Sequence, residues 1–319
     1  MINNKKNNKN LDLLSIFEHG KTTTEYVLDK IITKKTIHTL PHADITEDHL
    51  SCILKELDSL IGLESVKKLI NEIQAYSSIR KMRIIEDLAT DPLVLHMIFK
   101  GNPGTGKTTV ARLLGKILCH MELLEKGHLI EVERADLVGE YIGHTAVKVR
   151  DQLKKSQGGI LFIDEAYSLA RGGEKDFGKE AIDALVKGME DYKDNLILIL
   201  AGYKDEMNHF LNINPGLKSR FPIYIEFPDF SLEQLILIAE SIVEKRQYRL
   251  SISAKAKLAK IVSLKRIRDG VNSGNARLVR NIIERAIRKQ AVRLLKNGSF
   301  SRNDLITLMS DDIAEGDEL

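Results

Sequence analysis

The stretch Gly101-Asn102-Pro103-Gly104-Thr105-Gly106-Lys107-Thr108 decides the fold, because it agrees with the pattern G-x-x-x-x-G-K-[ST] at every fixed position. Glycines at this spacing let the backbone curl so that consecutive N–H groups point inward at anionic oxygens. Lys107 adds a full positive charge near the β- and γ-phosphates, and the Thr108 hydroxyl is a ligand for Mg²⁺. The pattern predicts a loop whose residues, from Gly101 through Thr108, bind the phosphates of a nucleotide.

The residues on both sides of this loop place it between a strand and a helix. Val94–Phe99 is an almost wholly apolar run typical of a buried strand. Apolar residues recur at helical spacing after the loop, so the N-terminus of a helix faces the phosphates, where its dipole favours negative charge. The apolar residues of this expected helix are Val110, Leu113, Leu114, Ile117, Leu118 and Met121.

Two carboxylates follow a second apolar run, Gly159–Ile163. Such a run is typical of a strand buried in a parallel sheet, which leaves Asp164 and Glu165 at the edge where open α/β sheets bind ligands. There Asp164 would hold Mg²⁺, directly or through water, and Glu165 would polarise the water that attacks the γ-phosphate. Two solvated acids at a strand end are the alternative, and the phosphate loop one βαβ unit earlier favours the catalytic interpretation.

Length and composition bound the class of protein. A chain of 319 residues exceeds the usual size of one domain, so two domains are expected. Cys52 and Cys119 stand far apart, which favours a reducing compartment over a disulfide. Residues 1–10 are almost wholly Asn and Lys, without the apolar core of a secretory signal, and the longest apolar run, Leu196–Ala201, is too short to cross a bilayer. We therefore expect a cytoplasmic protein.

Apolar runs alternate with helical patterns over the first two thirds of the chain. This alternation predicts an α/β fold, a five-stranded parallel sheet of the P-loop NTPase type flanked by helices, followed by a small all-helical lid domain. The expected domains are an N-terminal extension at 1–44, a nucleotide-binding α/β domain at 45–228 and a lid domain with an acidic tail at 229–319. The expected strands are Val94–Phe99, His128–Glu131, Gly159–Ile163, Leu196–Ala201 and Ile223–Phe227.

Helical patterns precede the first expected strand and follow the fifth. A pattern from Thr46 to about Arg83 is broken at Leu60–Leu63, and only helices are expected beyond Pro228-Asp229. Along the third of these helices, Arg280, Arg288 and Lys289 are expected on the polar side, opposite an apolar stripe. The expected lid helices are Ser231–Arg246, Ser253–Lys265, Asn275–Lys296 and a short one near Arg302–Met309.

The net charge of +3 conceals a strong segregation of charge. Residues 245–302 contain 17 Lys/Arg against 2 Asp/Glu, whereas residues 303–319 contain six acids and no base. A basic helical segment suits an anionic partner, such as nucleic acid or an acidic face of another subunit, and a solvated amphipathic helix is the alternative. Nucleic acid is the less favoured partner, since neither an RNA-binding nor a helix-turn-helix signature accompanies the basic residues.

These motifs, in this order, resemble the AAA+ ATPases, and specifically their CbxX/CfxQ branch, which includes the red-type Rubisco activases. The resemblance runs from about Leu60 to Lys296. It implies a ring hexamer that binds ATP with Mg²⁺ between its subunits and uses ATP hydrolysis to remodel a protein client. The phrases that carry it are MIFKGNPGTGKTTVARLLG at 97–115, ERADLVGEYIGHTAV at 133–147, GILFIDEAYSLARGGEKDFGKEA at 159–181 and LILAGYKDEMNHFLNINPGLKSRFP at 198–222.

The resemblance also assigns roles to single residues. Arg220 matches the arginine finger, which reaches the γ-phosphate bound by the neighbouring subunit and offsets its developing charge. Arg277, in Gly274-Asn275-Ala276-Arg277, matches the second sensor at the start of a lid helix, and Ile61-Gly62 matches the segment that contacts adenine. The usual polar first sensor is replaced by the run Leu200-Ala201-Gly202-Tyr203, so this sensor stays unassigned, with Tyr203 or a neighbour as the candidate.

Tyr141-Ile142-Gly143 matches the pore loop of the family, where an aromatic ring faces the central channel and grips polypeptide. A Tyr buried in a loop is the alternative. The first interpretation of the whole chain is a protein-remodelling motor similar to a sporulation ATPase. A Rubisco-activase-like remodeller and a nucleic-acid-associated AAA+ loader are the alternatives. A scaffold that binds ATP but hydrolyses little of it is disfavoured, because the catalytic residues are all present: Lys107, Asp164, Glu165 and Arg220.

Overall fold

The computed structural model describes residues 43–90, 93–141, 143–171, 176–269 and 274–314. The chain divides into two compact units, residues 1–52 and residues 53–319. In the first unit the described residues all belong to helix α3 (Ala43–Asp58), which continues into the second unit. The expected N-terminal extension, residues 1–44, therefore lies almost wholly outside the described part of the chain.

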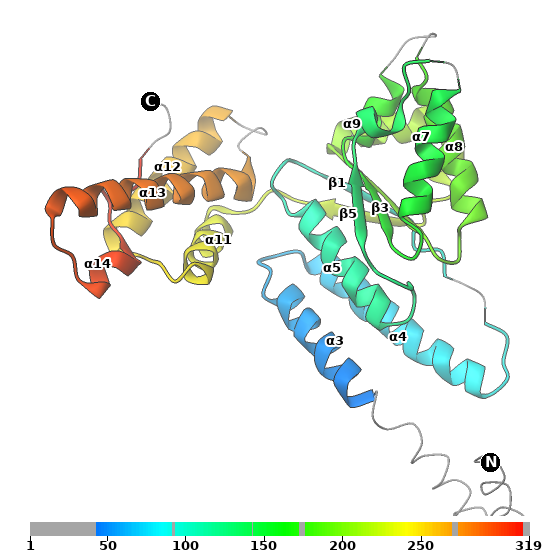
Figure 1. Cartoon of the computed structure of the whole chain (residues 1–319), viewed down its shortest axis with the longest axis horizontal. Helices are drawn as coiled ribbons and strands as arrows, with labels where there is room; N and C mark the ends of the chain where they lie inside the picture. Colours follow the sequence, from blue (N-terminus) through cyan, green and yellow to red (C-terminus); the bar gives the residue numbers. More distant parts are fainter. Residues whose placement is uncertain (1–42, 91–92, 142, 172–175, 270–273, 315–319) are drawn as a thin grey trace, which may run out of the picture. The chain divides into compact units, whose positions relative to one another are not determined.

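The second unit contains a sheet of five parallel strands in the order β2-β3-β4-β1-β5, which confirms the expected α/β fold (Figure 1). Every residue of β3 and β4 is buried, because helices cover both faces of the sheet. Strand β4 lies between β1 and β3, so the first strand does not pair with the strand that ends in Asp164. The strands are β1 (Met97–Gly101), β2 (Leu129–Val132), β3 (Ile160–Ile163), β4 (Ile197–Gly202) and β5 (Ile223–Phe227).

The first strand begins later than the apolar run suggested. Pairing with β4 starts at Met97, opposite Ile199, whereas Val94 is exposed and precedes the ladder. Apolarity alone therefore placed the strand about three residues early, since a run of apolar residues does not show which of them form ladder hydrogen bonds.

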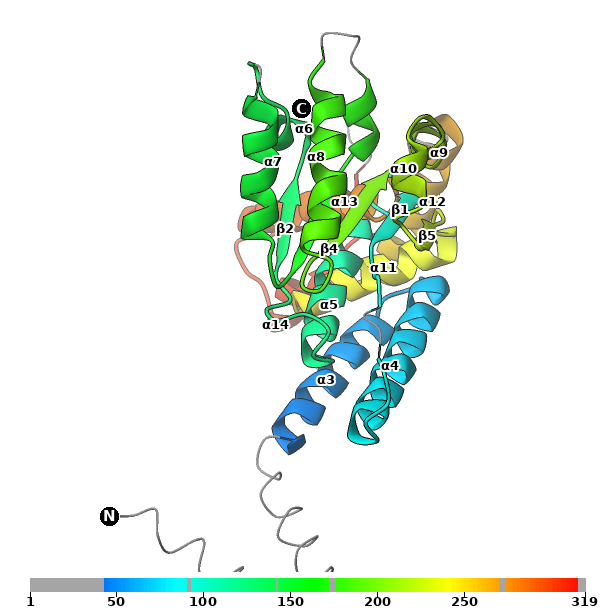
Figure 2. The ribbon, with the colours of Figure 1, turned by 90° about the vertical axis from the view of Figure 1, so that its right-hand side faces the viewer.

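The helices of the α/β part follow the expected alternation. Helix α5 buries its apolar stripe, including Val110, Leu114 and Leu118, against the sheet, as its spacing predicts. Helices α7 and α8 run side by side (Figure 2), and a Cβ at Gly188 would lie 2.3 Å from Leu153 Cδ1. The elements are α4 (Glu64–Ile85), α5 (Lys107–His120), α6 (Arg134–Leu137), α7 (His144–Lys155), η1 (Ala166–Ala170), α8 (Gly178–Asp191), α9 (Lys204–Ile213) and α10 (Pro215–Lys218).

The C-terminal part has its own hydrophobic cluster, formed by buried residues from Phe230 to Ile313. Its helical members come from three helices, α11 (Leu232–Lys245), α12 (Ile252–Asp269) and α13 (Asn275–Asn297). A fourth helix, α14 (Arg302–Ile306), follows them and contributes no buried residue. Across the described ranges, no helix combines the length and the apolarity that crossing a bilayer requires.

The C-terminal part is helical, as expected, apart from one short pair of strands that the sequence does not predict. Strands β6 (Arg249–Leu250) and β7 (Thr307–Leu308) form a short parallel pair. The last helix ends at Ile306 because Gln290 Nε2 donates to the carbonyls of Asp304, Leu305 and Thr307, which holds this turn open. A strand of two residues is too short to produce an alternating pattern, so periodicity does not predict it.

Candidate active site

The phosphate loop connects β1 to α5 at the carboxyl edge of the sheet. Its shape is set locally: Thr105 Oγ1 donates to the Asn102 carbonyl at 2.8 Å, and Gly106 takes a left-handed φ of 98° directly before the helix. A side chain at that φ would be strained, so glycine is required for the loop to enter the helix in this way. The first N–H groups of α5 therefore point toward the space in front of the loop.

Lys107 bends back along the loop. Its Nζ donates to the carbonyls of Gly101 and Asn102 at 2.8 and 2.9 Å. Burial lowers the pKa of Lys107 below its ordinary value, and the negative charge of Asp164 is the largest opposing effect. The ammonium group is thus held close to a carboxylate and has lost part of its contact with water, which strengthens its attraction for phosphate oxygens.

Asp164 and Glu165 leave β3 in a tight turn. The Asp164 N–H donates to the Val132 carbonyl at 3.0 Å, and Asp164 Oδ1 accepts from the Glu165 N–H at 3.0 Å. Glu165 has a left-handed backbone, with φ 46° and ψ 43°, an unusual conformation for a residue other than glycine. This turn directs the two carboxylates differently, although they are adjacent in the chain.

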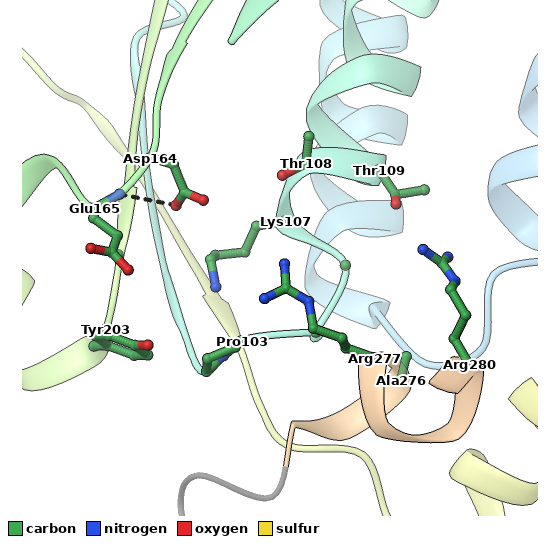
Figure 3. A pocket seen from close by; sticks show the side chains of 13 residues that line it. Pro103, Lys107, Thr108, Thr109, Asp164, Glu165, Tyr203, Ala276, Arg277 and Arg280 are labelled. Atoms are coloured by element: carbon green, nitrogen blue, oxygen red, sulfur yellow. Dashed lines mark hydrogen bonds between the residues drawn. The ribbon is translucent and has the colours of Figure 1, made fainter. Parts of the chain in front are cut away.

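Figure 3 shows the cavity that these side chains share, with a volume of about 270 Å³. Lys107 and Arg277 both point into it, and Asp164 and Glu165 lie on its other side. The structure thus brings together a lysine of the phosphate loop, two carboxylates at the end of β3 and an arginine of a C-terminal helix. The lining residues are Pro103, Gly104, Gly106, Lys107, Thr108, Thr109, Asp164, Glu165, Gly202, Tyr203, Ala276, Arg277 and Arg280.

Arg280 is the main lining residue that sequence reasoning missed. It was expected on the polar, solvent-facing side of its helix, yet it lines the cavity on the side of Thr109 (Figure 3). Residues three apart on a helix share a face, so the spacing from Arg277 to Arg280 was a signal that could have found it. The lid helix therefore supplies two guanidinium groups to the cavity.

Tyr203 also lines the cavity, beside Glu165 (Figure 3). Tyr203 is the first residue after β4. Because β4 lies between β1 and β3, Tyr203 lies between the phosphate loop, which follows β1, and the acid pair, which follows β3. Its ring lies 5.8 Å from the ring of Tyr167. Tyr203 thus has the location that a polar first sensor needs.

Thr108 and Asp164 are suitable ligands for Mg²⁺, because this ion prefers hydroxyl and carboxylate oxygens. Both residues line the cavity, and Thr108 Oγ1 also donates to Glu131 Oε1 at 3.4 Å. The described residues contain no group of three or more His, Cys, Asp or Glu side chains arranged to hold a metal. Two protein ligands agree with the way Mg²⁺ is usually held beside phosphates, with water and phosphate oxygens as the other ligands.

The segment Ile61-Gly62 lies next to the site but does not line the cavity. Gly62 has φ 71°, and a Cβ there would lie 3.1 Å from Gln234 Nε2 and 3.7 Å from the ring of Phe230. The neighbouring Leu63 reaches to within 4.0 Å of a Cβ placed on Gly106. The segment thus lies between the phosphate loop and helix α11.

Arg220 lies outside the cavity of its own chain. Its guanidinium pairs with Glu190, with Nε 3.1 Å from Oε1, and its Nη1 donates to the Gly216 carbonyl at 2.9 Å. The side chain remains 35 % exposed. In this conformation Arg220 cannot serve the phosphates bound by the same subunit.

Tyr141 is 66 % exposed, so the alternative of a buried loop tyrosine is wrong. Its ring makes an edge contact with His144, the first residue of α7, with ring centroids 5.4 Å apart. Of the neighbouring residues in the expected pore loop, Ile142 lies outside the described residues.

A loop that binds phosphates at the edge of a parallel sheet, opposite an acid pair, defines the class of P-loop nucleoside triphosphatases. Sequence comparison gives the family. The family described as "ATPase family associated with various cellular activities (AAA)" matches residues 97–229, and the AAA lid domain matches residues 231–318. The chain belongs to the AAA ATPases, in the group that contains stage V sporulation protein K and the CbxX/CfxQ proteins, and it is an ATPase.

Several relatives match over most of their length. Stage V sporulation protein K of Bacillus subtilis is 57 % identical over 267 residues, 83 % of each chain. Protein CfxQ of Xanthobacter flavus is 44 % identical over 83 % of this chain and 84 % of its own. The chloroplastic ribulose bisphosphate carboxylase/oxygenase activase of Cyanidioschyzon merolae is 43 % identical over 82 % of this chain and 90 % of its own.

Among solved structures, a mutant of RuvB from Thermotoga maritima superposes with a TM-score of 0.51. It covers 78 % of this chain and 70 % of its own, at 21 % sequence identity. At this identity the likeness establishes the shared fold and nothing further.

Proposed function

We propose that this chain is an ATP-driven motor that remodels a protein client, works as a ring of six subunits in the cytoplasm and serves spore formation. One observation carries the proposal: Lys107, Asp164, Glu165 and Arg277 converge on a single cavity. Charge stabilisation and positioning are what phosphoryl transfer needs, and these four residues supply both.

The residues divide the chemistry of ATP hydrolysis among them. Gly101, Asn102, Pro103, Gly104, Thr105, Gly106, Lys107 and Thr108 hold the phosphates, and Ile61-Gly62 contacts the adenine through backbone groups. Glu165 orients the attacking water and accepts its proton. Arg277 neutralises charge on the γ-phosphate. Thr108 and Asp164 would hold Mg²⁺, which would supply further neutralisation of the phosphate charge.

The ring proposal is supported by Arg220. Its location outside its own cavity means that an arginine finger at this position has to act on a neighbouring subunit. An arginine supplied in this way accelerates hydrolysis by roughly 10³–10⁵-fold in other NTPases. The bonds to Glu190 and to the Gly216 carbonyl hold the guanidinium outside its own cavity until a neighbour offers a phosphate.

The domain proposal keeps an α/β domain at 45–228 and a lid domain at 229–319. Two separate hydrophobic clusters support it, one made of residues between Ile98 and Phe221 and the other of residues between Phe230 and Ile313. Motion of the lid against the α/β domain, driven by hydrolysis, would move the loop that carries Tyr141.

The proposed client is a polypeptide that is bound with little sequence specificity. Tyr141 is an exposed aromatic side chain, which offers large apolar contact with little demand on sequence and suits pulling on varied polypeptides. Identity of 57 % with the sporulation protein, against 43 % with the Rubisco activase, favours the sporulation role over the Rubisco-activase-like alternative.

Two variants test the catalytic assignment. Lys107→Ala should greatly weaken ATP binding, because it removes the only full charge of the phosphate loop. Glu165→Gln should bind ATP and hydrolyse it roughly 10²–10⁴-fold more slowly, the range expected for a lost general base. Binding is measured by calorimetry and turnover by phosphate release, and equal turnover in Glu165→Gln and wild type would contradict the assignment. Pull-down with Glu165→Gln in ATP would then identify the client.

A further inference from the structure

A hydrogen-bonded bridge joins the phosphate loop to the start of helix α13. Its central residue is Asp229, which lies at the end of the α/β part and accepts from both sides. Asn102 Nδ2 donates to Asp229 Oδ1 and Oδ2 at 2.9 and 3.0 Å, and Asn275 Nδ2 donates to Asp229 Oδ1 at 2.8 Å. Bonds to a carboxylate are stronger than those between neutral groups, so this bridge contributes more than two ordinary amide contacts.

The burial, the backbone conformation and the hydrogen bonds of Asn275 all favour asparagine at this position. It is only 2 % exposed and has a left-handed φ of 44°, a conformation that asparagine tolerates better than most residues. Its Oδ1 accepts from the Phe230 N–H at 3.1 Å, and its Nδ2 also lies 3.4 Å from the Pro103 carbonyl. The position needs a donor and an acceptor on one short side chain, which aspartate and alanine cannot supply.

The backbones of the loop and the helix also touch. The Ala276 N–H donates to the Gly104 carbonyl at 3.1 Å. A Cβ at Gly104 would lie 2.3 Å from the Gly274 carbonyl oxygen and 2.9 Å from the Arg277 nitrogen. Gly104 is therefore required both by its φ of 74° and by the approach of the helix. The residue after this contact is Arg277, whose side chain points into the cavity (Figure 3).

We propose that Asp229 and Asn275 are positioning residues that seat the start of α13 on the phosphate loop and thereby aim Arg277 at the γ-phosphate. Asn102 links this seat to the loop, so a change of loop conformation on nucleotide exchange reaches the lid through Asp229. Asp229 is exposed, so water competes for its hydrogen bonds. The contact between α13 and the phosphate loop therefore breaks and re-forms at a moderate cost in free energy. This inference rests on the proposed ATPase site and adds the connection between nucleotide and lid.

Hydrogen exchange measures the contact between the start of α13 and the phosphate loop, and it does not depend on ATPase activity. The first N–H groups of a helix have no partner within it, so protection of the Ala276 amide comes from its bond to Gly104. Asp229→Ala in the full chain should speed exchange in the segment 274–280 roughly 10-fold, the effect of a lost hydrogen bond to a charged group. Glu284→Ala is the matched control, because it breaks the 3.0 Å pair of Glu284 with Arg246 elsewhere in the lid and should leave this exchange unchanged.

Kinetics test whether Asp229 acts through Arg277. Asp229→Ala should lower kcat more than it lowers affinity for ADP, because ADP lacks the γ-phosphate that Arg277 faces. The double variant Asp229→Ala with Arg277→Ala should be no slower than Arg277→Ala alone. If the double variant instead shows the product of the two fold-losses in kcat measured for the single variants, the proposal is overturned. Equal turnover in wild type and Glu165→Gln would instead refute the ATPase site. Hydrogen exchange would then still test the contact between the start of α13 and the phosphate loop.

A rescue experiment covers the case in which Asp229→Ala fails to fold. Asn102→Asp combined with Asp229→Asn exchanges amide and carboxylate, keeps the net charge and keeps an oxygen for Asn275 to donate to. The pair should recover most of the protection of segment 274–280 that Asp229→Asn loses alone. Unchanged exchange in Asp229→Ala, or a pair no better protected than Asp229→Asn, would overturn the proposal.

Discussion

Two residues with unusual backbone conformations stand at the functional part of the molecule. Glu165 and Asn275 both have positive φ without being glycine, and each is placed where its side chain meets the nucleotide cavity or its loop. Such conformations cost of order 1–3 kcal/mol and persist only where their surroundings determine them. At Glu165 the turn separates the directions of two adjacent carboxylates, as the proposed division of roles requires, with Asp164 for Mg²⁺ and Glu165 for water.

A buried histidine makes stability depend on pH. His96 is 3 % exposed, its Nδ1 accepts from the Leu198 N–H at 3.1 Å, and burial lowers its pKa to about 4, opposed by a backbone hydrogen bond to Met189. Between pH 6.5 and 4 the unfolded chain binds a proton that the folded chain does not, so stability is full above pH 6.5 and is lost as the pH falls. The loss amounts to as much as about 3 kcal/mol.

Urea unfolding between pH 4 and 7 measures this dependence. His96→Gln should flatten the fall in unfolding free energy below pH 6.5, because it removes the titrating group. His209→Gln, at an exposed position, is the control and should keep the slope of the wild type. An undiminished slope in His96→Gln would assign the acid sensitivity to other groups.

At the scale of elements, helix α13 connects the lid to the chemistry. Its apolar face, with Val279, Ile283 and Ala286, is buried in the C-terminal cluster, while Arg277 and Arg280 project into the cavity. The periodicity of the sequence identified the buried face. It could not identify which part of the polar face meets the phosphate loop, because that contact depends on how α13 is seated at Gly104.

The Tyr141 loop gives the prediction at this scale. Because Tyr141 is 66 % exposed, Tyr141→Ala should leave the melting temperature and basal ATP turnover nearly unchanged while removing the stimulation of turnover by an unfolded polypeptide such as casein. Tyr141→Phe should keep most of that stimulation, since the ring face makes the contact. Normal stimulation in a stable Tyr141→Ala protein would exclude the loop from client binding.

At the scale of the whole molecule, the site proposed here is complete only between two subunits. Arg220→Ala should bind ATP normally and lose hydrolysis, because the finger acts on the neighbour. Mixing Arg220→Ala with Lys107→Ala subunits should restore part of the activity, since one supplies an intact pocket and the other an intact finger. Native mass spectrometry confirms the mixed rings, and an absence of activity at every mixing ratio would count against a shared site.

The sequence by itself determined the parallel sheet, the phosphate loop and the acid pair, because each depends on residues close together in the chain: glycine spacing, an apolar run, the end of a strand. Tertiary structure alone decided what meets across long separations. The bond from Asn102 to Asp229 spans 127 residues, and that from Asn275 to Asp229 spans 46. Tyr203 reaches the cavity because β4 lies between β1 and β3, an order that no local pattern encodes. Local preferences fix elements, whereas the contacts between elements follow from how their buried faces pack.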